Sequence, residues 1–366
     1  MAVLTAGRGE PVTPGRRVLL AAREEQLDSL LALRHVAAHL GGLRPVHLPP
    51  GDAPLAPAVP EHPPTDPALP DPPLPEVALV CDDEAATGRL LELGIPVVHL
   101  SSGHAGPAPA RPAERALHRQ HRPGWLLGPT GGARPTGALA PTRLTRNRHR
   151  AGALLLLSAW DVPNEELEAF AAGPLRALVH EAVRRTGHCE VVCDTRLAPV
   201  HAALDGLTET LRCPDPDPGS CSYSTPSPSP SPSPDHGPGA APRYAREPGL
   251  AAVRVHRAAE VDVDALHAAA EVFLAAPTLG ALVLAQARRA PLGFVPPLGA
   301  AQRDLAARVT ELVPVPLATD PGDPSLWVPP EDGAVAQWSA LDPSLDDLRG
   351  AQRVARTLRQ LSLAPL

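Results

Sequence analysis

The chain has 366 residues, 43% of them hydrophobic, so it is long enough for one large or two medium domains with a buried core. Its 33 basic residues, all of them arginine, are outnumbered by 40 acidic ones, which gives a net charge of −7. This balance argues against a dedicated nucleic-acid-binding protein, because such a protein needs positive charge to neutralise phosphates.

The sequence shows no clear signal for secretion, for a membrane span or for a metal site. No apolar stretch of secretory length follows the charged N-terminal residues, so we expect no leader and a cytoplasmic protein. The apolar segment Val272–Ala285 is shorter than the ~20 residues of a membrane-spanning helix, and Pro277 and Gly280 interrupt it. The five cysteines are expected to be reduced thiols, and no metal site is predicted.

Two segments are rich in proline. The first, at about 49–75, mixes proline with Asp, Glu and His, and the second, 214–248, contains a Ser-Pro repeat. A Ser-Pro repeat favours extended polyproline II and cannot form a core. We interpret both as insertions, and 214–248 as a disordered one.

In the first half of the chain, short apolar runs alternate with stretches of helical spacing. The expected strands are 17–22, 44–48, 77–81 and 95–100, and the expected helices are 25–40 and 82–93. Residues 101–150 are expected to be rich in loops.

The pattern then restarts. The expected strands are 153–157, 190–193, 252–256, 271–275 and 291–295. The expected helices are 165–186 with an interruption near Gly173-Pro174, then 197–204, 263–270, 279–288, 302–312 and an amphipathic terminal helix over 345–361.

Alternating strands and helices indicate an α/β protein with parallel sheets covered on both faces. Two successive units predict two Rossmann-like domains facing a cleft. We place the N-terminal, acceptor domain at 1–148, the C-terminal, donor domain at 149–330, and a tail with the amphipathic helix at 331–366.

Two segments resemble a known family. LLELGIPVVHL (Leu90–Leu100) and, more closely, Val253–Gln302 resemble two-domain, GT-B-fold nucleotide-sugar glycosyltransferases. Among these, the chain is most similar to the actinobacterial group related to cytosylglucuronic acid (CGA) synthase. That enzyme joins glucuronic acid from UDP-glucuronate to cytosine.

The resemblance implies a metal-independent, inverting glycosyltransferase of specialised metabolism. Its donor would be a UDP-sugar, with UDP-glucuronate as the candidate, and its acceptor would be a small molecule, with a nucleobase as the candidate. It would need no cofactor. A helix N-terminus would stabilise the charge on the departing UDP. The implied donor-binding residues are Thr278, Leu279, Gly280, Ala281, Gln302, Arg257 and Ala258.

Two residues at strand ends are candidates for catalysis. His104 follows one strand and would deprotonate the acceptor, or it is an ordinary loop histidine. Asp82 follows another strand, where cleft residues gather in open α/β sheets, but it could also cap the next helix.

Several polar residues typical of the family are missing. Ala276, Leu284 and Ala301 stand where many members have His, Glu and Asp. The alternative hypothesis is therefore a non-catalytic relative that acts as a nucleotide-sugar sensor or as the protein partner of an active enzyme.

Overall fold

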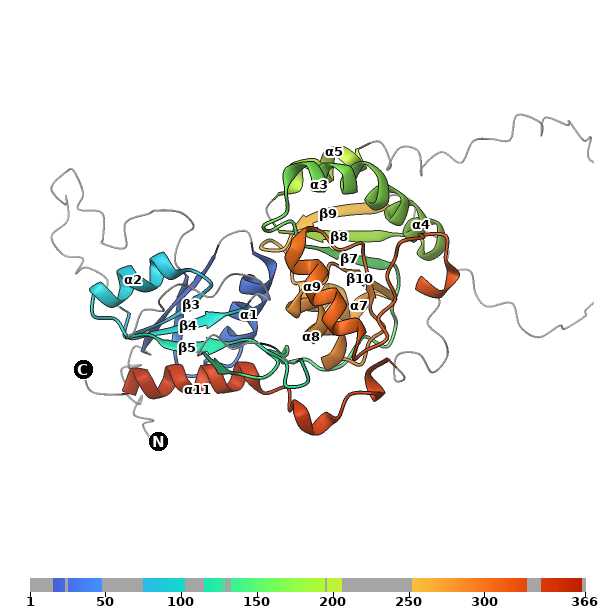
Figure 1. The fold of residues 1–366 in the computed structure, drawn as a ribbon. Helices are drawn as coiled ribbons and strands as arrows, with labels where there is room; N and C mark the ends of the chain where they lie inside the picture. Colours follow the sequence, from blue (N-terminus) through green and yellow to red (C-terminus); the bar gives the residue numbers. More distant parts are fainter. Residues whose placement is uncertain are drawn as a thin grey trace, which may run out of the picture.

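The computed structural model describes residues 16–23, 26–47, 75–102, 115–126, 128, 133–194, 196–205, 252–327 and 337–363. His104, nearly all of the segment 49–75 and the whole of 214–248 lie outside the described residues. The described chain forms two parallel β-sheets, each flanked by helices, side by side in Figure 1. The predicted α/β class with two Rossmann-like domains is confirmed.

The first sheet has six parallel strands in the order β2-β1-β3-β4-β5-β6. They span β1 (Arg17–Ala22), β2 (Arg44–His47), β3 (Val77–Cys81), β4 (Val97–Ser101), β5 (Leu117–Gln120) and β6 (Arg134–Pro135). The stretch 101–150, expected to be rich in loops, also contains the two strands β5 and β6, which the sequence did not predict. Both are short and have the sequences LHRQ and RP, so neither shows the apolar run that marks a buried strand.

Helices cover both faces of this sheet. On one face, α1 (Leu27–Ala37) and the terminal helix α11 (Gly350–Leu363) pack on Val18, Leu20 and Leu79. On the other face, α2 (Glu84–Glu92) packs on Val80. The chain therefore returns to its first domain at its C-terminal end, and Figure 1 shows α11 beneath the first sheet.

The second sheet has five parallel strands in the order β11-β10-β7-β8-β9. They span β7 (Ala153–Leu157), β8 (Cys189–Cys193), β9 (Val253–Arg257), β10 (Val272–Ala275) and β11 (Gly293–Phe294). The helices of this domain are α3 (Asn164–Phe170), α4 (Arg176–Thr186), α5 (Leu197–Leu204), α7 (Val263–Ala269), α8 (Leu279–Ala287) and α9 (Gly299–Thr310).

Strand β7 is a continuous apolar run because both of its faces are buried. Leu155 and Leu157 belong to a core beneath α3, α4 and α5, whereas Leu154 and Leu156 belong to a second core beneath α7, α8 and α9. A parallel strand buried on both faces has no solvent-facing position, so polar residues do not alternate along it.

The interruption expected near Gly173-Pro174 is a π-helical segment, η1 (Ala171–Leu175), that joins α3 to α4 without a break. Proline lacks an N–H and clashes with the carbonyl four residues earlier, and a wider turn accommodates it.

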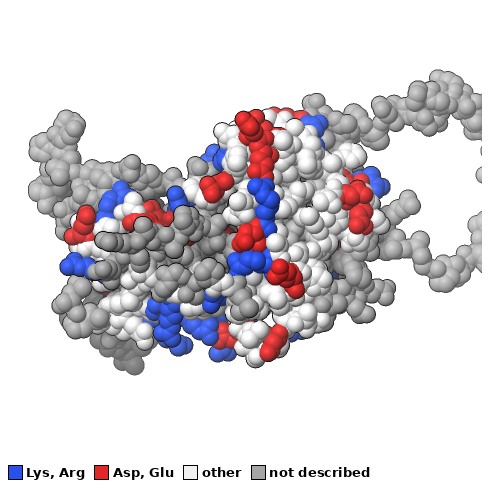
Figure 2. All heavy atoms as spheres, viewed as in Figure 1, with Lys and Arg blue, Asp and Glu red and all other residues white. Residues whose placement is uncertain are grey.

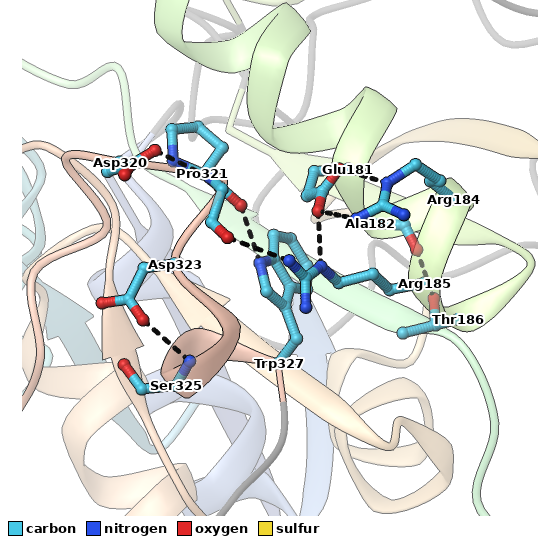
Figure 3. Close-up of polar contacts among 11 residues, drawn as sticks. Glu181, Ala182, Arg184, Arg185, Thr186, Asp320, Pro321, Asp323, Ser325 and Trp327 are labelled. Atoms are coloured by element: carbon cyan, nitrogen blue, oxygen red, sulfur yellow. Dashed lines mark hydrogen bonds and ion pairs between the residues drawn. The ribbon is translucent and has the colours of Figure 1, made fainter.

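A contact cluster fixes the chain after β11 to the end of α4 (Figure 3). Arg185 pairs with Glu181 and donates to the carbonyl of Gly322 at 2.9 Å. Trp327 donates through Nε1 to the carbonyl of Pro321 at 2.9 Å. The short 3-10 helix η2 (Pro324–Leu326) is thereby held against the second domain.

Candidate functional site

The predicted donor-binding turn lies at the start of α8, where β10 ends. Thr278 is the N-cap of this helix, and its hydroxyl accepts a hydrogen bond from the N–H of Ala281 at 3.2 Å. The strand–turn–helix arrangement agrees with the sequence prediction. The first amides of such a helix have no partner within the helix, so something else must satisfy them.

The partner of these amides is Asp28, a residue of α1 in the first domain. Its carboxylate accepts hydrogen bonds from the N–H of Gly280 at 2.7 Å and from the N–H of Leu279 at 3.2 Å. A carboxylate of the chain itself therefore occupies the position where the resemblance implies a diphosphate. The helix N-terminus suits either anion, because both are negatively charged acceptors.

The surroundings of Gly280 are closed. A Cβ atom at this position would lie 2.6 Å from Cδ1 of Leu31 and 2.9 Å from Oδ1 of Asp28. Thr278, Leu279, Gly280 and Ala281 are all buried. The turn thus faces α1 at close contact in this structure.

Asp28 is 7% exposed, and its pKa is raised from 3.8 to about 7. Burial is the main cause, and the charges of Asp82 and Asp194 add to it. The hydrogen bonds from Gly280 and Leu279 act in the opposite direction, because they stabilise the ionised form.

Asp82 lies at the end of β3 and has a φ of 56°, a left-handed conformation that Asp adopts more readily than most residues. Its carboxylate accepts hydrogen bonds from the hydroxyl of Ser29 at 2.6 Å, the N–H of Ser102 at 2.9 Å, and the hydroxyl of Ser102. It thereby links β3, β4 and α1. The cap of α2 is Asp83, which accepts from the N–H of Ala86 at 2.8 Å.

Asp194 plays a similar part in the second domain, directly after β8. It accepts hydrogen bonds from the hydroxyl of Ser158 at 2.9 Å, the N–H of Ala159 at 2.9 Å and the N–H of Trp160 at 3.2 Å. Burial raises the pKa of Asp194, against the opposing effect of these hydrogen bonds. The backbone amides after β7 are thus also bound by a carboxylate of the chain.

Gln302 lies within the first turns of α9, which begins three residues earlier than the sequence indicates, at Gly299. Its carbonyl accepts from the N–H of Leu298 at 3.0 Å, and its amide donates to the carbonyl of Ser158 at 2.8 Å. Gln302 is buried, and both ends of its side chain bind the protein. It ties α9 to the loop after β7.

The remaining predicted residues lie apart from the α8 turn. Arg257 is the last residue of β9 and Ala258 follows it, and β7 and β8 separate that strand from β10. Arg257 is exposed and pairs with Glu260 at 3.9 Å, whereas Ala258 is buried. Leu284, at the position where many family members have Glu, is fully buried in the core.

The two domains share one hydrophobic core at the α1–α8 contact. Leu27 and Leu31 of α1, together with Trp125, are buried in the same cluster as Leu279 and Leu282 of α8. Trp125 also donates through Nε1 to the side chain of Gln286 at 3.0 Å. Water is therefore excluded from the space between these two helices.

A polar network lies beside this shared core. His35 of α1 contacts the carbonyl of Leu139 through Nδ1 at 2.6 Å and Asp264 of α7 through Nε2 at 3.0 Å. Arg288, whose side chain is fully buried, lies 3.4 Å from Asp264. Burial raises the pKa of Asp264, but the hydrogen bond and charge of His35 and the charge of Arg288 outweigh it, so the pKa lies below its ordinary value.

The family model of the CGA synthase-related proteins matches residues 18–215 and 240–366. The chain belongs to the CGA synthase-related family. A search of curated proteins finds no match.

Among solved structures, this CGA synthase-related protein is similar to MurG of Acinetobacter baumannii, at 10% identity and a TM-score of 0.42, over 94% of this chain and 99% of that one. It is similar to the glycosyltransferase SnogD of Streptomyces nogalater, at 14% identity and a TM-score of 0.43, over 95% and 100%. The glycotransferase of kitacinnamycin matches at 16% identity and a TM-score of 0.41, over 96% and 98%.

Within the part of this CGA synthase-related protein that the structure describes, no three His, Cys, Asp or Glu side chains are grouped to hold a metal ion. No helix in the same part is long and apolar enough to cross a membrane.

The sequence reasoning missed Asp28 and Asp194. The signal for Asp28 was its spacing, because an aspartate between Leu27 and Leu31 lies on the apolar face of its helix. Asp194 directly follows a buried strand, which is where site residues collect in open α/β sheets.

Proposed function

We propose that this CGA synthase-related protein is a glycosyltransferase-like protein that does not transfer sugar and acts as the partner of an active enzyme. The observation that carries the proposal is the pair of hydrogen bonds from the N-terminal amides of α8 to the buried carboxylate of Asp28. A nucleotide diphosphate could reach these amides only by displacing this carboxylate.

Electrostatics also opposes a diphosphate here. Asp82 and Asp194 lie close enough to Asp28 for their charges to raise its pKa. A diphosphate in the same position would carry more negative charge than the carboxylate it replaces, so the same two groups would repel it more strongly.

The apolar contact adds a larger cost. Opening the space would expose Leu27, Leu31 and Leu279, each at about 1.5–3 kcal/mol. The two amides would exchange one anionic acceptor for another, so their hydrogen bonds, worth about 1.5–3 kcal/mol each, return little net gain. The form in which α1 contacts α8 is therefore favoured over a form with a diphosphate bound at α8. This disfavours a nucleotide-sugar sensor that uses the α8 turn, and it leaves the role of protein partner.

The first test is calorimetric titration of the purified protein with UDP and with UDP-glucuronate, followed by an assay of donor hydrolysis. We expect no binding up to about 1 mM and no hydrolysis. Asp28→Ala combined with Leu31→Ala removes both the carboxylate and part of the apolar contact, so it should gain measurable UDP affinity. Asp83→Ala combined with Leu31→Ala, which removes a capping carboxylate from α2 instead, should not. Micromolar UDP binding by the unmodified protein that is lost in Gly280→Val would overturn the proposal.

A second experiment addresses the partner role. The protein is added to a glycosyltransferase encoded by a neighbouring gene, and the turnover of that enzyme is measured. We expect a change in turnover that depends on the concentration of the added protein and saturates.

The family match favours a second candidate, an active, metal-independent inverting glycosyltransferase that moves glucuronate from UDP-glucuronate to a nucleobase. In that case α1 would separate from α8 during the reaction, the acceptor would bind the first domain, and His104 or Asp82 would serve as general base. Incubation with UDP-glucuronate and cytosine in the presence of a chelator, analysed by mass spectrometry, distinguishes the two. A glucuronylated cytosine product supports the enzyme.

A further inference from the structure

A second concave site lies in the first domain, away from α8. It is a cavity of about 570 Å³ between the strands β5 and β6, the start of α11 and the segment before it. Five arginines line it, and among the described residues the carboxylates that line it are Asp346 and Asp347. The arginines are Arg119, Arg122, Arg134, Arg353 and Arg356. Figure 2 shows basic side chains gathered at the lower edge of this domain, where Figure 1 places α11.

The strand register brings two of these arginines together. Arg119 of β5 is paired with Arg134 of β6, and paired residues on adjacent parallel strands point to the same side of the sheet. Like charges in this position repel each other. Burial lowers the pKa of Arg119, and the charge of Arg134 lowers it further.

The two carboxylates of the cavity are already bound. Asp346 accepts hydrogen bonds from the N–H groups of Gly124 at 2.7 Å and Ala138 at 2.9 Å. Asp347 pairs with Arg353 at 2.6 Å. Neither contacts Arg119, Arg134 or Arg356 among the interactions of the described residues. Within the described part of the chain, no ion pair with a carboxylate compensates the positive charge of these three side chains.

We propose that this cavity binds a small molecule that carries phosphate groups. Planar guanidinium groups donate in pairs to phosphate oxygens, and several of them around one concave site would neutralise a multiply charged anion. The volume lies within the range of small-molecule sites, about 300–1,000 Å³. The site does not involve the α8 turn, so it is independent of the proposed function.

The test uses pyrophosphate as the probe and the full chain as the protein. Calorimetric titration at low salt should give saturable binding, and raising the salt from about 50 to about 300 mM should weaken it, because screening is stronger. Arg134→Ala and Arg356→Ala remove exposed side chains, so both variants should keep the fold, which a thermal melt confirms. We expect each to weaken pyrophosphate binding at least tenfold.

The matched control is Arg349→Ala. Arg349 is an exposed arginine just before α11 that does not line the cavity. The Arg349→Ala variant should bind pyrophosphate with the same affinity as the unmodified protein. Equal affinity in Arg134→Ala and the unmodified protein would overturn the proposal, and so would the absence of pyrophosphate binding. Binding of a poly-aspartate peptide without binding of pyrophosphate would instead assign the cavity to an acidic protein segment. Asp28→Ala should leave pyrophosphate binding here unchanged, which separates this result from that of the donor-site test.

Discussion

At the scale of single residues, Asp28 decides the character of the predicted donor site. It belongs to the first domain but caps a helix of the second, 252 residues later in the chain. Its pKa of about 7 means that the folded protein holds a proton which the unfolded chain has already lost at neutral pH. Stability should therefore fall as the pH rises from about 4 to about 7 and then level off.

Asp28→Asn should remove this dependence. The asparagine keeps an oxygen that can accept from Gly280 but cannot ionise. The full effect of the raised pKa is on the order of 4 kcal/mol. About 2.5–3 kcal/mol of this effect falls between pH 5 and pH 8, where thermal melts of both proteins measure it. Asp83→Asn is a control that should retain the trend of the unmodified protein. An unchanged pH dependence in Asp28→Asn would show that another group is responsible.

Gly280 offers a second prediction at this scale. A methyl group there would press on Leu31 and Asp28, so Gly280→Ala should lower the free energy of unfolding by about 1–3 kcal/mol. Gly88 lies inside α2 with no atom within 4 Å of a Cβ, so Gly88→Ala should raise stability by about 0.5–1 kcal/mol. Urea denaturation of the two variants gives the comparison. A stabilising Gly280→Ala would mean that α1 does not pack against α8 in solution.

At the scale of elements, the end of α4 fixes the segment that follows β11 (Figure 3). Glu181 contacts both Arg184 and Arg185, and its pKa is lowered to about 2, mainly by the hydrogen bond from Arg184. Only Arg185 also reaches the second segment, through the carbonyl of Gly322. Arg184 is more than half exposed, which limits what its ion pair contributes.

Arg185→Ala should therefore lower the free energy of unfolding by about 1 kcal/mol, and Arg184→Ala by no more than about 0.5 kcal/mol. Chemical denaturation of the two variants measures the difference. Equal losses would indicate that the contact with Gly322 does not contribute to stability.

At the scale of the whole molecule, the shared core and the network of His35, Asp264 and Arg288 join the two domains. We expect them to unfold together in one transition. Leu31→Ala should weaken the contact between the domains. We expect it to lower the free energy of unfolding by about 2–5 kcal/mol and to separate the thermal unfolding into two transitions. Leu93→Ala, at an exposed position, should change stability by less than about 0.5 kcal/mol. A single transition in Leu31→Ala, recorded by calorimetry, would show that other contacts couple the domains.

The sequence by itself determined most of the elements and the start of α8. The apolar run of β7, the helical spacing of α1 and the turn at Thr278 depend on residues close together in the chain, and each leaves a periodic or local pattern. The family resemblance rested on the same kind of local pattern, and the family match bears it out.

Only the tertiary structure decided which residues far apart in the chain contact one another. Strand β5 depends on β4, and the edge strand β6 depends on β5, for their hydrogen bonds rather than on their own composition. The side chains of Gln302 and Asp82 bind distant backbone and hydroxyl groups, so their residue types alone could not reveal that these polar groups were occupied. The capping of α8 by Asp28 requires the two domains to pack together, and that packing is set by apolar contacts between residues far apart in the chain, which no local pattern records.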